Sequence, residues 1–312
     1  MQPDAVGRIA IVGAGAVGGY YGGRLADAGE EVSFLVRSGL DEWRRQGLRV
    51  ESPKGNFSLR APQVAGTAGE IGPVDLVVVA WKATSNASYR EAITPLLHEK
   101  TAILTLQNGL GNTEHLAGLF GAERILGGLC FVCINRVAPA HIRHLAEGLV
   151  TLGEFQEGRE SDRRLERLVA LFQRAKIECR AVRDLVRAQW LKLVWNVPFN
   201  GLCIAKGGIN TEELLAQPGG REEVRALMSE VISGAEALER GIDRRVIEQQ
   251  ISATADMGGY RPSSMIDYLE GREVEVDAIW AEPLRRAQAA GADLPFWERL
   301  LVDIRTRLAE RS

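Results

Sequence analysis

The fold of this chain is decided by the stretch Ile9-Ala10-Ile11-Val12-Gly13-Ala14-Gly15-Ala16-Val17-Gly18-Gly19 near its start. The apolar run Ile9–Val12 predicts a buried strand, and the residues after the glycines have the spacing of a helix. The first glycine of the motif permits a tight turn, the second lets the backbone approach a pyrophosphate, and the third lets helix and strand pack closely. The helix N-terminus presents backbone N–H groups to the phosphates. The sequence therefore predicts a dinucleotide site formed by Gly13, Ala14, Gly15, Ala16, Val17 and Gly18.

Length and charge narrow the class of protein. At 312 residues the chain is long enough for two domains, and its formal net charge of -3 gives no indication of a nucleic-acid or anionic-membrane partner. No uninterrupted apolar run is long enough to span a bilayer. The N-terminus leads directly into the first predicted strand and leaves no room for a signal peptide. We therefore expect a cytoplasmic protein.

Arg37 follows the predicted second strand, Glu31–Val36, which completes a βαβ unit. An acidic residue at this strand end binds the ribose 2′-hydroxyl of NAD, whereas an arginine accommodates the 2′-phosphate of NADP. Arg37 therefore favours NADP(H) as the cofactor. The competing interpretation is a solvated surface arginine.

Two further polar residues follow predicted parallel strands. Lys82 lies just past Asp75–Ala80, and Asn108 follows Ala102–Leu106. Ligands of open α/β sheets bind at the carboxyl ends of the strands, so both residues are candidate cofactor or substrate contacts. A surface lysine and an ordinary Asn-Gly turn are the competing interpretations.

The pattern of strands and helices changes at about residue 181. Before it, Ile125–Ile134 predicts a strand, and Ile142–Leu145 with Leu149–Leu152 predicts a returning hairpin. After it, only helical patterns follow, over Leu185–Phe199, Glu222–Arg240, Arg244–Ala255, Glu275–Ala290 and Pro295–Arg311. This order predicts an α/β protein with an N-terminal Rossmann-type dinucleotide-binding domain, residues 1–181, and an all-α C-terminal domain, residues 182–312.

A polar stripe marks the first of these later helices. Lys192, Asn196 and Asn200 fall at i, i+4 and i+8, on one face of a segment that is otherwise almost entirely apolar. A helix that is apolar on most sides is buried, so the stripe needs polar partners or a water-filled cleft; a stripe facing solvent is the alternative. Burial lowers the pKa of a lysine, which suits proton transfer near neutral pH. Pro198 lies in the same helix, removes one backbone donor and is expected to kink it.

The cysteines and histidines indicate no redox or metal chemistry. Cys130 and Cys133 lie on a predicted strand, where residues three apart point to opposite faces, whereas redox pairs begin a helix. We interpret them as small buried hydrophobic residues. The four histidines show no ligand spacing with cysteine or acidic residues, so no metal site is predicted.

Taken together, these residues resemble the ketopantoate reductase family (2-dehydropantoate 2-reductases) over essentially the whole chain. The resemblance rests on the glycine motif, Arg37, Lys82, Leu106–Gly111, Lys192-x-x-x-Asn196-x-x-x-Asn200, Asn210, Ser263-Ser264-Met265 and Glu275. The helix with lysine and two asparagines, combined with the Ser-Ser-Met segment, is the specific part of it. The resemblance implies NADPH-dependent reduction of a 2-keto acid, ketopantoate, to pantoate in the route to pantothenate and coenzyme A.

The resemblance also implies roles for single residues. Lys192 matches the general acid that protonates the carbonyl oxygen, and Glu275 matches an acidic residue near this lysine and the cofactor. An acid beside the lysine would keep it protonated. Lys82 and Asn108 match positions on the nicotinamide side of the cofactor. The implied substrate contacts are Asn108, Lys192, Asn196, Asn200, Asn210 and Ser264.

Three departures from the family pattern leave alternatives open. The spacing from Ser264 to Glu275 is one residue shorter than usual, which leaves Glu273 as an alternative acid. Pro198 lies inside the catalytic helix, and Leu129-Cys130-Phe131-Val132-Cys133 replaces a threonine-rich strand. The alternatives for function are therefore a reductase of another 2-keto acid, or a non-catalytic NADP(H)-binding sensor. The sequence does not give the oligomeric state, and a homodimer stays open.

Overall fold

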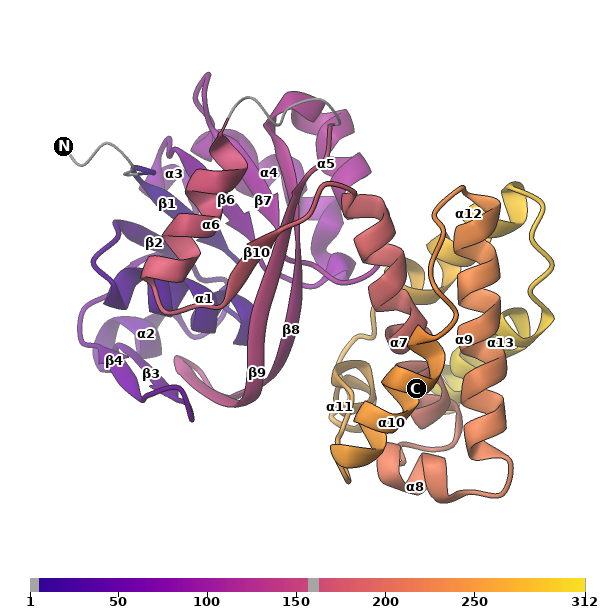
Figure 1. Ribbon diagram of the computed structural model, residues 1–312. Coiled ribbons are helices and arrows are strands. Elements are labelled where there is room, and N and C mark those ends of the chain that lie inside the picture. The colour runs from indigo at the N-terminus through magenta and orange to yellow at the C-terminus, as the bar shows by residue number, and fades with distance from the viewer. Residues whose placement is uncertain (1–5, 157–162, 312) are drawn as a thin grey trace. The chain divides into compact units, whose positions relative to one another are not determined.

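The structure of the protein, a computed structural model, describes residues 6–156 and 163–311 and contains two compact units (Figure 1). The first unit comprises Met1–Asn108 and Asn112–Leu185, and the second comprises Gly109–Gly111 and Val186–Ser312. The first unit combines strands and helices, whereas the described elements of the second are all helices. The predicted fold class is therefore confirmed.

The strands of the first unit form one mixed sheet in the order β4-β3-β9-β8-β7-β6-β1-β2-β5, with β10 paired to β9. Their bounds are β1 Ile9–Val12, β2 Val32–Leu35, β3 Leu48–Glu51, β4 Phe57–Leu59, β5 Gln63–Ala65, β6 Leu76–Val79, β7 Ala102–Thr105, β8 Ile125–Ala138, β9 His141–Glu154 and β10 Cys179–Ala181. Pairing is parallel from β8 through β7, β6, β1 and β2 to β5. This parallel centre is the arrangement that the glycine motif predicts.

The central strand β1 is buried on both faces, which explains its uninterrupted apolar sequence. Ile9 and Ile11 belong to one hydrophobic core, and Ala10 and Val12 belong to another. A parallel strand between two layers of helices reads as an apolar run, not as an alternating pattern. The helices of this unit are α1 Ala16–Asp27, α2 Leu40–Gln46, α3 Ala68–Ile71, α4 Tyr89–Ile93, α5 Asn112–Phe120 and α6 Arg164–Arg174.

The predicted hairpin between Ile142–Leu145 and Leu149–Leu152 is wrong, because both segments belong to the single long strand β9, which pairs antiparallel with β8 (Figure 1). The pairing register shifts between Phe131 and Val132, opposite Glu147 and Gly148. These two residues have φ of +65° and +120°. The interruption is therefore a β-bulge, in which an extra residue kinks the strand without reversing it.

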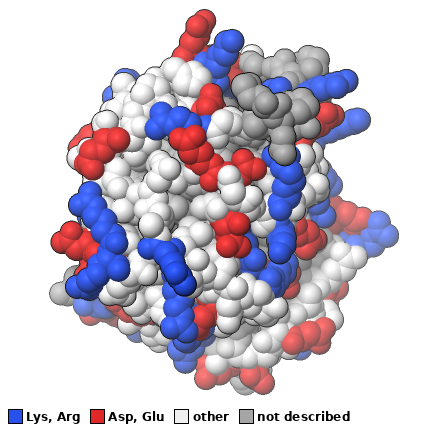
Figure 2. All heavy atoms as spheres, turned by 90° about the vertical axis from the view of Figure 1, so that its left-hand side faces the viewer, with Lys and Arg blue, Asp and Glu red and all other residues white. Residues whose placement is uncertain are grey.

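Charges of both signs are mixed on the face of the first unit that Figure 2 shows, where acidic side chains lie among the basic ones. Ion pairs of this unit include Arg8 Nε with Glu31 Oε1 at 3.2 Å and Arg143 Nε with Glu51 Oε2 at 2.9 Å. Such exposed pairs add little to stability. The mixture of both signs in Figure 2 leaves no large field of one sign on this face.

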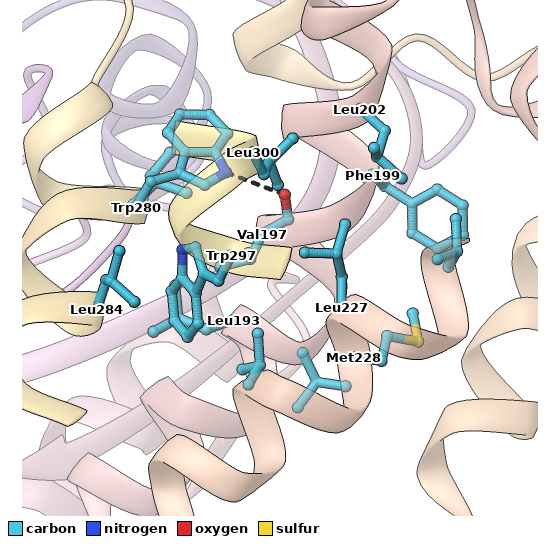
Figure 3. Close-up of a cluster of buried hydrophobic side chains, with 14 of the residues drawn as sticks. Leu193, Val197, Phe199, Leu202, Leu227, Met228, Trp280, Leu284, Trp297 and Leu300 are labelled. Atoms are coloured by element: carbon cyan, nitrogen blue, oxygen red, sulfur yellow. Dashed lines mark hydrogen bonds between the residues drawn. The ribbon is translucent and has the colours of Figure 1, made fainter. Parts of the chain in front are cut away.

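The second unit packs its helices around one apolar core, part of which Figure 3 shows. The elements are α7 Leu185–Ala205, α8 Thr211–Ala216, α9 Gly220–Ala237, α10 Val246–Asp256, α11 Ser263–Leu269, a π-helical turn Asp277–Ala281, α12 Glu282–Ala289 and α13 Pro295–Arg311. α7 supplies Leu193, Val197 and Phe199 to this core, as its mostly apolar sequence predicts. None of the described helices is long and apolar enough to cross a membrane.

Three helical features differ from the sequence-based expectation. α8 and α11 were not predicted, because each is short and carries no extended helical period. The predicted helix Glu275–Ala290 is divided into the π-helical turn and α12. α7 continues past Pro198 to Ala205.

Gly201 permits a close contact between α7 and the π-helical turn. The indole Nε1 of Trp280 donates a hydrogen bond of 2.9 Å to the carbonyl of Val197 (Figure 3). A Cβ on Gly201 would lie 2.7 Å from Leu300 Cδ2 and 2.8 Å from Trp280 Nε1. The absent side chain therefore lets the indole reach the helix backbone.

We expect Gly201→Ala to destabilise the protein by about 1–3 kcal/mol, the usual cost of overfilling a packed core. The matched control is Gly118→Ala in α5, because a Cβ there meets nothing within 4 Å. Alanine normally stabilises a helix over glycine by about 0.5–1 kcal/mol. Thermal unfolding of both variants measures the effect, and a rise in stability for both would contradict the packing argument.

Candidate functional site

The three motif glycines meet different surroundings, as their predicted roles require. Gly13 has φ of +104°, and a Cβ there would lie 2.5 Å from the backbone nitrogen of Trp81. A Cβ on Gly18 would collide with the carbonyl oxygen of Gly13, so this residue allows α1 to lie close to β1. A Cβ on Gly15 would meet nothing within 4 Å. Space is therefore left open at the one glycine that is predicted to face the pyrophosphate.

The start of α1 has the geometry of an anion site. Gly15 is the N-cap residue, and no side chain caps the helix. Ala14 is buried, whereas Ala16 and Val17 are half-buried in the first turn. Uncapped N–H groups at a helix N-terminus carry a partial positive charge that favours phosphate.

Four adjacent strands end at the same level, and each is followed by a predicted site residue. The pairing register aligns Leu35 of β2 with Val12 of β1, Val12 with Val79 of β6, and Val79 with Thr105 of β7. The residues that follow these strand ends are Arg37, the glycine turn, Lys82 and Asn108. The first unit therefore gathers all of its predicted cofactor contacts at one edge of the sheet.

Arg37 is exposed two residues after the end of β2, and the described residues provide it with no hydrogen bond or ion pair. Lys82 and Asn108 are half-buried, and Lys82 is the N-cap residue of a short 3-10 helix, Ala83–Ser88. An exposed guanidinium group is suited to bind an external anion.

A network of side-chain amides holds the loop after β7, and sequence reasoning missed it. Gln107 Nε2 donates to Asn86 Oδ1 at 2.8 Å, and Asn86 Nδ2 donates to Asn112 Oδ1 at 2.8 Å. Asn112 Nδ2 then donates to the carbonyl of Asn108 at 2.9 Å. The backbone at Asn108 is therefore fixed by hydrogen bonds. Asn86 lies 21 residues before Gln107 and 26 before Asn112, so no local spacing pattern could reveal the network.

The polar stripe of α7 is largely buried. Asn196 is 7% exposed and Asn200 is 2% exposed, while Lys192 is half-buried. Asn200 Oδ1 accepts a hydrogen bond of 2.9 Å from the backbone N–H of Ser264, itself buried at the start of α11. The stripe thus has a polar partner, and α7 and α11 are joined at two predicted substrate residues.

Asn210 is the N-cap of α8 in a capping box. Its Oδ1 accepts from the backbone N–H of Glu213 at 2.9 Å, and its own N–H donates to Glu213 Oε2 at 2.8 Å. Asn200 and Asn210 therefore both use Oδ1 to accept a backbone hydrogen bond. Each leaves its Nδ2 amide end as a hydrogen-bond donor.

The two candidate acids differ in burial. Glu275 is 8% exposed, whereas Glu273 is exposed to solvent. Glu275 lies two residues before the π-helical segment, and its carbonyl accepts from Ile279 N–H at 3.1 Å. π-helical turns occur often at functional sites, and the apolar period of this segment gave no sign of one. Of the two candidates, only Glu275 is buried.

The cysteines are placed as expected. Cys130 and Cys133 both lie on β8, are buried and form no disulfide. Within residues 6–156 and 163–311, no group of three or more histidine, cysteine or acidic side chains could hold a metal ion.

A glycine turn at the carboxyl ends of parallel strands is typical of dinucleotide-binding proteins, and here the same chain carries a helical unit with a buried polar stripe. Comparison with known proteins gives the family. The family model described as "Ketopantoate reductase PanE/ApbA" matches residues 9–157, and "Ketopantoate reductase PanE/ApbA C terminal" matches residues 184–307. The chain belongs to the ketopantoate reductase family, as the sequence predicts.

Named relatives agree with this membership. A 2-dehydropantoate 2-reductase of Nostoc sp. is 39% identical over 92% of this chain and 91% of its own length. The crystal structure of 2-dehydropantoate 2-reductase from Geobacter metallireducens is 45% identical, covers 98% of this chain and 100% of its own, and has a TM-score of 0.93. D-mandelate dehydrogenase in a ternary structure shares the fold at 22% identity, covers 97% of this chain and 98% of its own, and has a TM-score of 0.89.

The open space at Gly15 leads to a prediction. We expect Gly15→Ala to fold normally, because its Cβ meets no protein atom within 4 Å, but to weaken NADPH binding by filling space next to the phosphates. Gly18→Ala should instead lower the unfolding temperature, because its Cβ collides with the Gly13 carbonyl. Thermal unfolding and NADPH fluorescence titration separate the two effects. Wild-type NADPH affinity in Gly15→Ala would contradict the predicted phosphate position.

Proposed function

We propose that this protein reduces ketopantoate (2-dehydropantoate) to pantoate with NADPH, in the route to pantothenate and coenzyme A. The observation that carries the proposal is the family match over both units, together with a polar stripe that presents donors. The carboxylate and keto oxygens of a 2-keto acid are hydrogen-bond acceptors. The Nδ2 donor ends of Asn200 and Asn210 complement them.

The first unit fits a nicotinamide dinucleotide. The open position at Gly15 and the uncapped start of α1 suit the pyrophosphate, and the exposed Arg37 suits a 2′-phosphate. NADPH supplies the hydride when bound. The residues that we assign to NADPH binding are Gly13, Ala14, Gly15, Ala16, Val17, Gly18, Arg37, Lys82, Asn108 and Glu275.

The second unit supplies the proton and most of the substrate contacts. Lys192 Nζ donates a proton to the carbonyl oxygen as that oxygen gains negative charge. The residues that we assign to substrate binding are Asn108, Lys192, Asn196, Asn200, Asn210 and Ser264. Burial of Asn196, Asn200 and Ser264 limits competing hydrogen bonds from water. We assign Glu275 to keep Lys192 protonated, because a negative charge close to a lysine favours its charged form.

The domain roles follow from these assignments. We propose residues 1–181 as the NADP(H)-binding domain and residues 182–312 as the substrate and catalytic domain. The cytoplasmic location and the homodimer stay predictions.

A second candidate function keeps the chemistry and changes the substrate. Pro198 lies inside α7 between Asn196 and Asn200, and Cys130 and Cys133 lie on β8 where the family pattern has threonines. Such changes suit another branched or larger 2-keto acid. A non-catalytic NADP(H) sensor is the third candidate, but it would not require the complete set of Lys192, Asn196 and Asn200.

The test of the proposed function is NADPH oxidation with ketopantoate, pyruvate and 2-ketoisovalerate, ranked by kcat/KM. We expect ketopantoate to be preferred. We also expect Lys192→Ala to lower kcat by about 10²–10⁴-fold, the usual contribution of a general acid, with NADPH binding unchanged.

Lys206→Ala is the matched control for this variant. Lys206 lies in the same unit and pairs with Glu223 Oε2 at 2.8 Å, away from the proposed roles. Near-normal turnover in Lys192→Ala would refute the mechanism. Preference for another keto acid would establish the second candidate, and NADPH binding without turnover of any substrate would establish the third.

Arg37 determines the choice of cofactor in this proposal. We expect Arg37→Ala to raise KM for NADPH by about tenfold or more and to leave KM for NADH nearly unchanged, because only NADPH has the 2′-phosphate. Arg90→Ala, an exposed arginine on α4, is the control. Steady-state kinetics with both cofactors measure the effect. An equal change for both cofactors would show that Arg37 is an ordinary surface residue.

A further inference from the structure

The π-helical turn Asp277–Ala281 leaves one carbonyl without a helical partner. The N–H of Glu282 donates to the carbonyl of Asp277, five residues earlier, and not to Ala278 as in an α-helix. In the same π-helical pattern, the carbonyl of Ala278 would accept from the N–H of residue 283. Residue 283 is proline and has no N–H. The carbonyl of Ala278 therefore needs a donor from elsewhere.

A segment distant in sequence supplies this donor. Gly109–Gly111, here called the strap, belongs to the second unit although its neighbours in sequence belong to the first. The N–H of Leu110 donates to the carbonyl of Ala278 at 2.9 Å. The Leu110 side chain is 3% exposed and lies in the helical core. The strap is therefore anchored by both its backbone and its side chain.

Glycine is required where the strap meets the turn. Gly109 has φ of +82°, and a Cβ there would collide with the carbonyl group of Ala278. A second anchor acts on the same turn, because Trp280 Nε1 bonds to Val197 of α7. The turn is thus fixed at Ala278 by the strap and at Trp280 by the helix that carries Lys192.

We infer that the strap is a positioning element for Glu275, an inference that rests on the proposed function of this residue. The strap satisfies the Ala278 carbonyl and so stabilises the π-helical hydrogen-bond pattern. Regular α-helical bonding would shift each backbone hydrogen-bond partner by one residue. This shift would rotate the segment before the turn, including Glu275, by about 100° about the helix axis relative to α12. Leu110 and Gly109 are therefore positioning residues that act through Glu275.

Two variants test this inference. Pro283→Ala supplies the backbone N–H that α-helical bonding to the carbonyl of Ile279 requires. It should therefore favour the α-helical pattern, in which the N–H of Glu282 takes the carbonyl of Ala278 and the strap is released. Gly109→Ala should displace it by collision. Gly241→Ala is the control, because a Cβ at this residue of the same unit meets nothing within 4 Å. The readouts are kcat and KM for ketopantoate, the pH profile of kcat, NADPH binding, and hydrogen exchange at the Leu110 amide.

We expect Pro283→Ala and Gly109→Ala to lower kcat by roughly 10- to 100-fold, as misplacement of a catalytic constellation does. Exchange at the Leu110 amide should accelerate while NADPH binding is retained. The alkaline limb of kcat should move to lower pH, because a lysine with a displaced carboxylate loses its proton more readily. Glu275→Gln gives the reference for this shift, and Gly241→Ala should match the wild type.

The inference is overturned when the wild-type protein turns over its substrate and Pro283→Ala keeps the wild-type kcat and pH profile, whatever its thermal stability. Unchanged exchange at the Leu110 amide in Pro283→Ala would overturn it as well. Failure of the proposed function gives a different result, because the wild-type protein itself would then show no turnover of the keto acids. Pro283→Ala keeps the test decisive even where Gly109→Ala does not fold.

Discussion

The contact between α1 and β1 at Gly18 is the constraint on which the first unit depends. Any side chain at Gly18 would meet the Gly13 carbonyl, so the helix can lie this close to the strand only with glycine. That closeness directs the start of α1 to the edge where β2, β1, β6 and β7 end in register. One steric requirement therefore places the helix dipole beside the predicted cofactor residues.

The second unit depends in a similar way on α7. Its apolar residues form much of the helical core, and its carbonyl at Val197 receives the Trp280 indole. Its polar stripe meets α11 through Asn200 and Ser264. A buried helix that carries polar residues is costly unless each polar group has a partner. For Asn200 the partner is α11, the helix that also carries the predicted substrate residue Ser264.

Sequence patterns predicted the parts of this fold that repeat or pack regularly. β1 and α13 have the predicted bounds, and the change from mixed elements to helices is confirmed. The patterns failed where one backbone feature interrupts a regular element. The bulge at Glu147 and Gly148 resembled a turn, and the π-helical turn was hidden within a continuous helical period. The role of Asn200 as a partner of Ser264 also depends on a contact between residues distant in sequence. No local pattern encodes it.

The asparagines of the helical unit explain why amides suit this site better than carboxylates. Oδ1 of Asn200 and Oδ1 of Asn210 each accept from a backbone N–H, which fixes the orientation of the amide. Aspartate could accept the same hydrogen bonds, but it would present a second oxygen, and a negative charge, where asparagine presents N–H donors. A 2-keto acid is an anion with acceptor oxygens, so a carboxylate would repel it. The helical fold and the proposed substrate therefore require opposite ends of the same amide group.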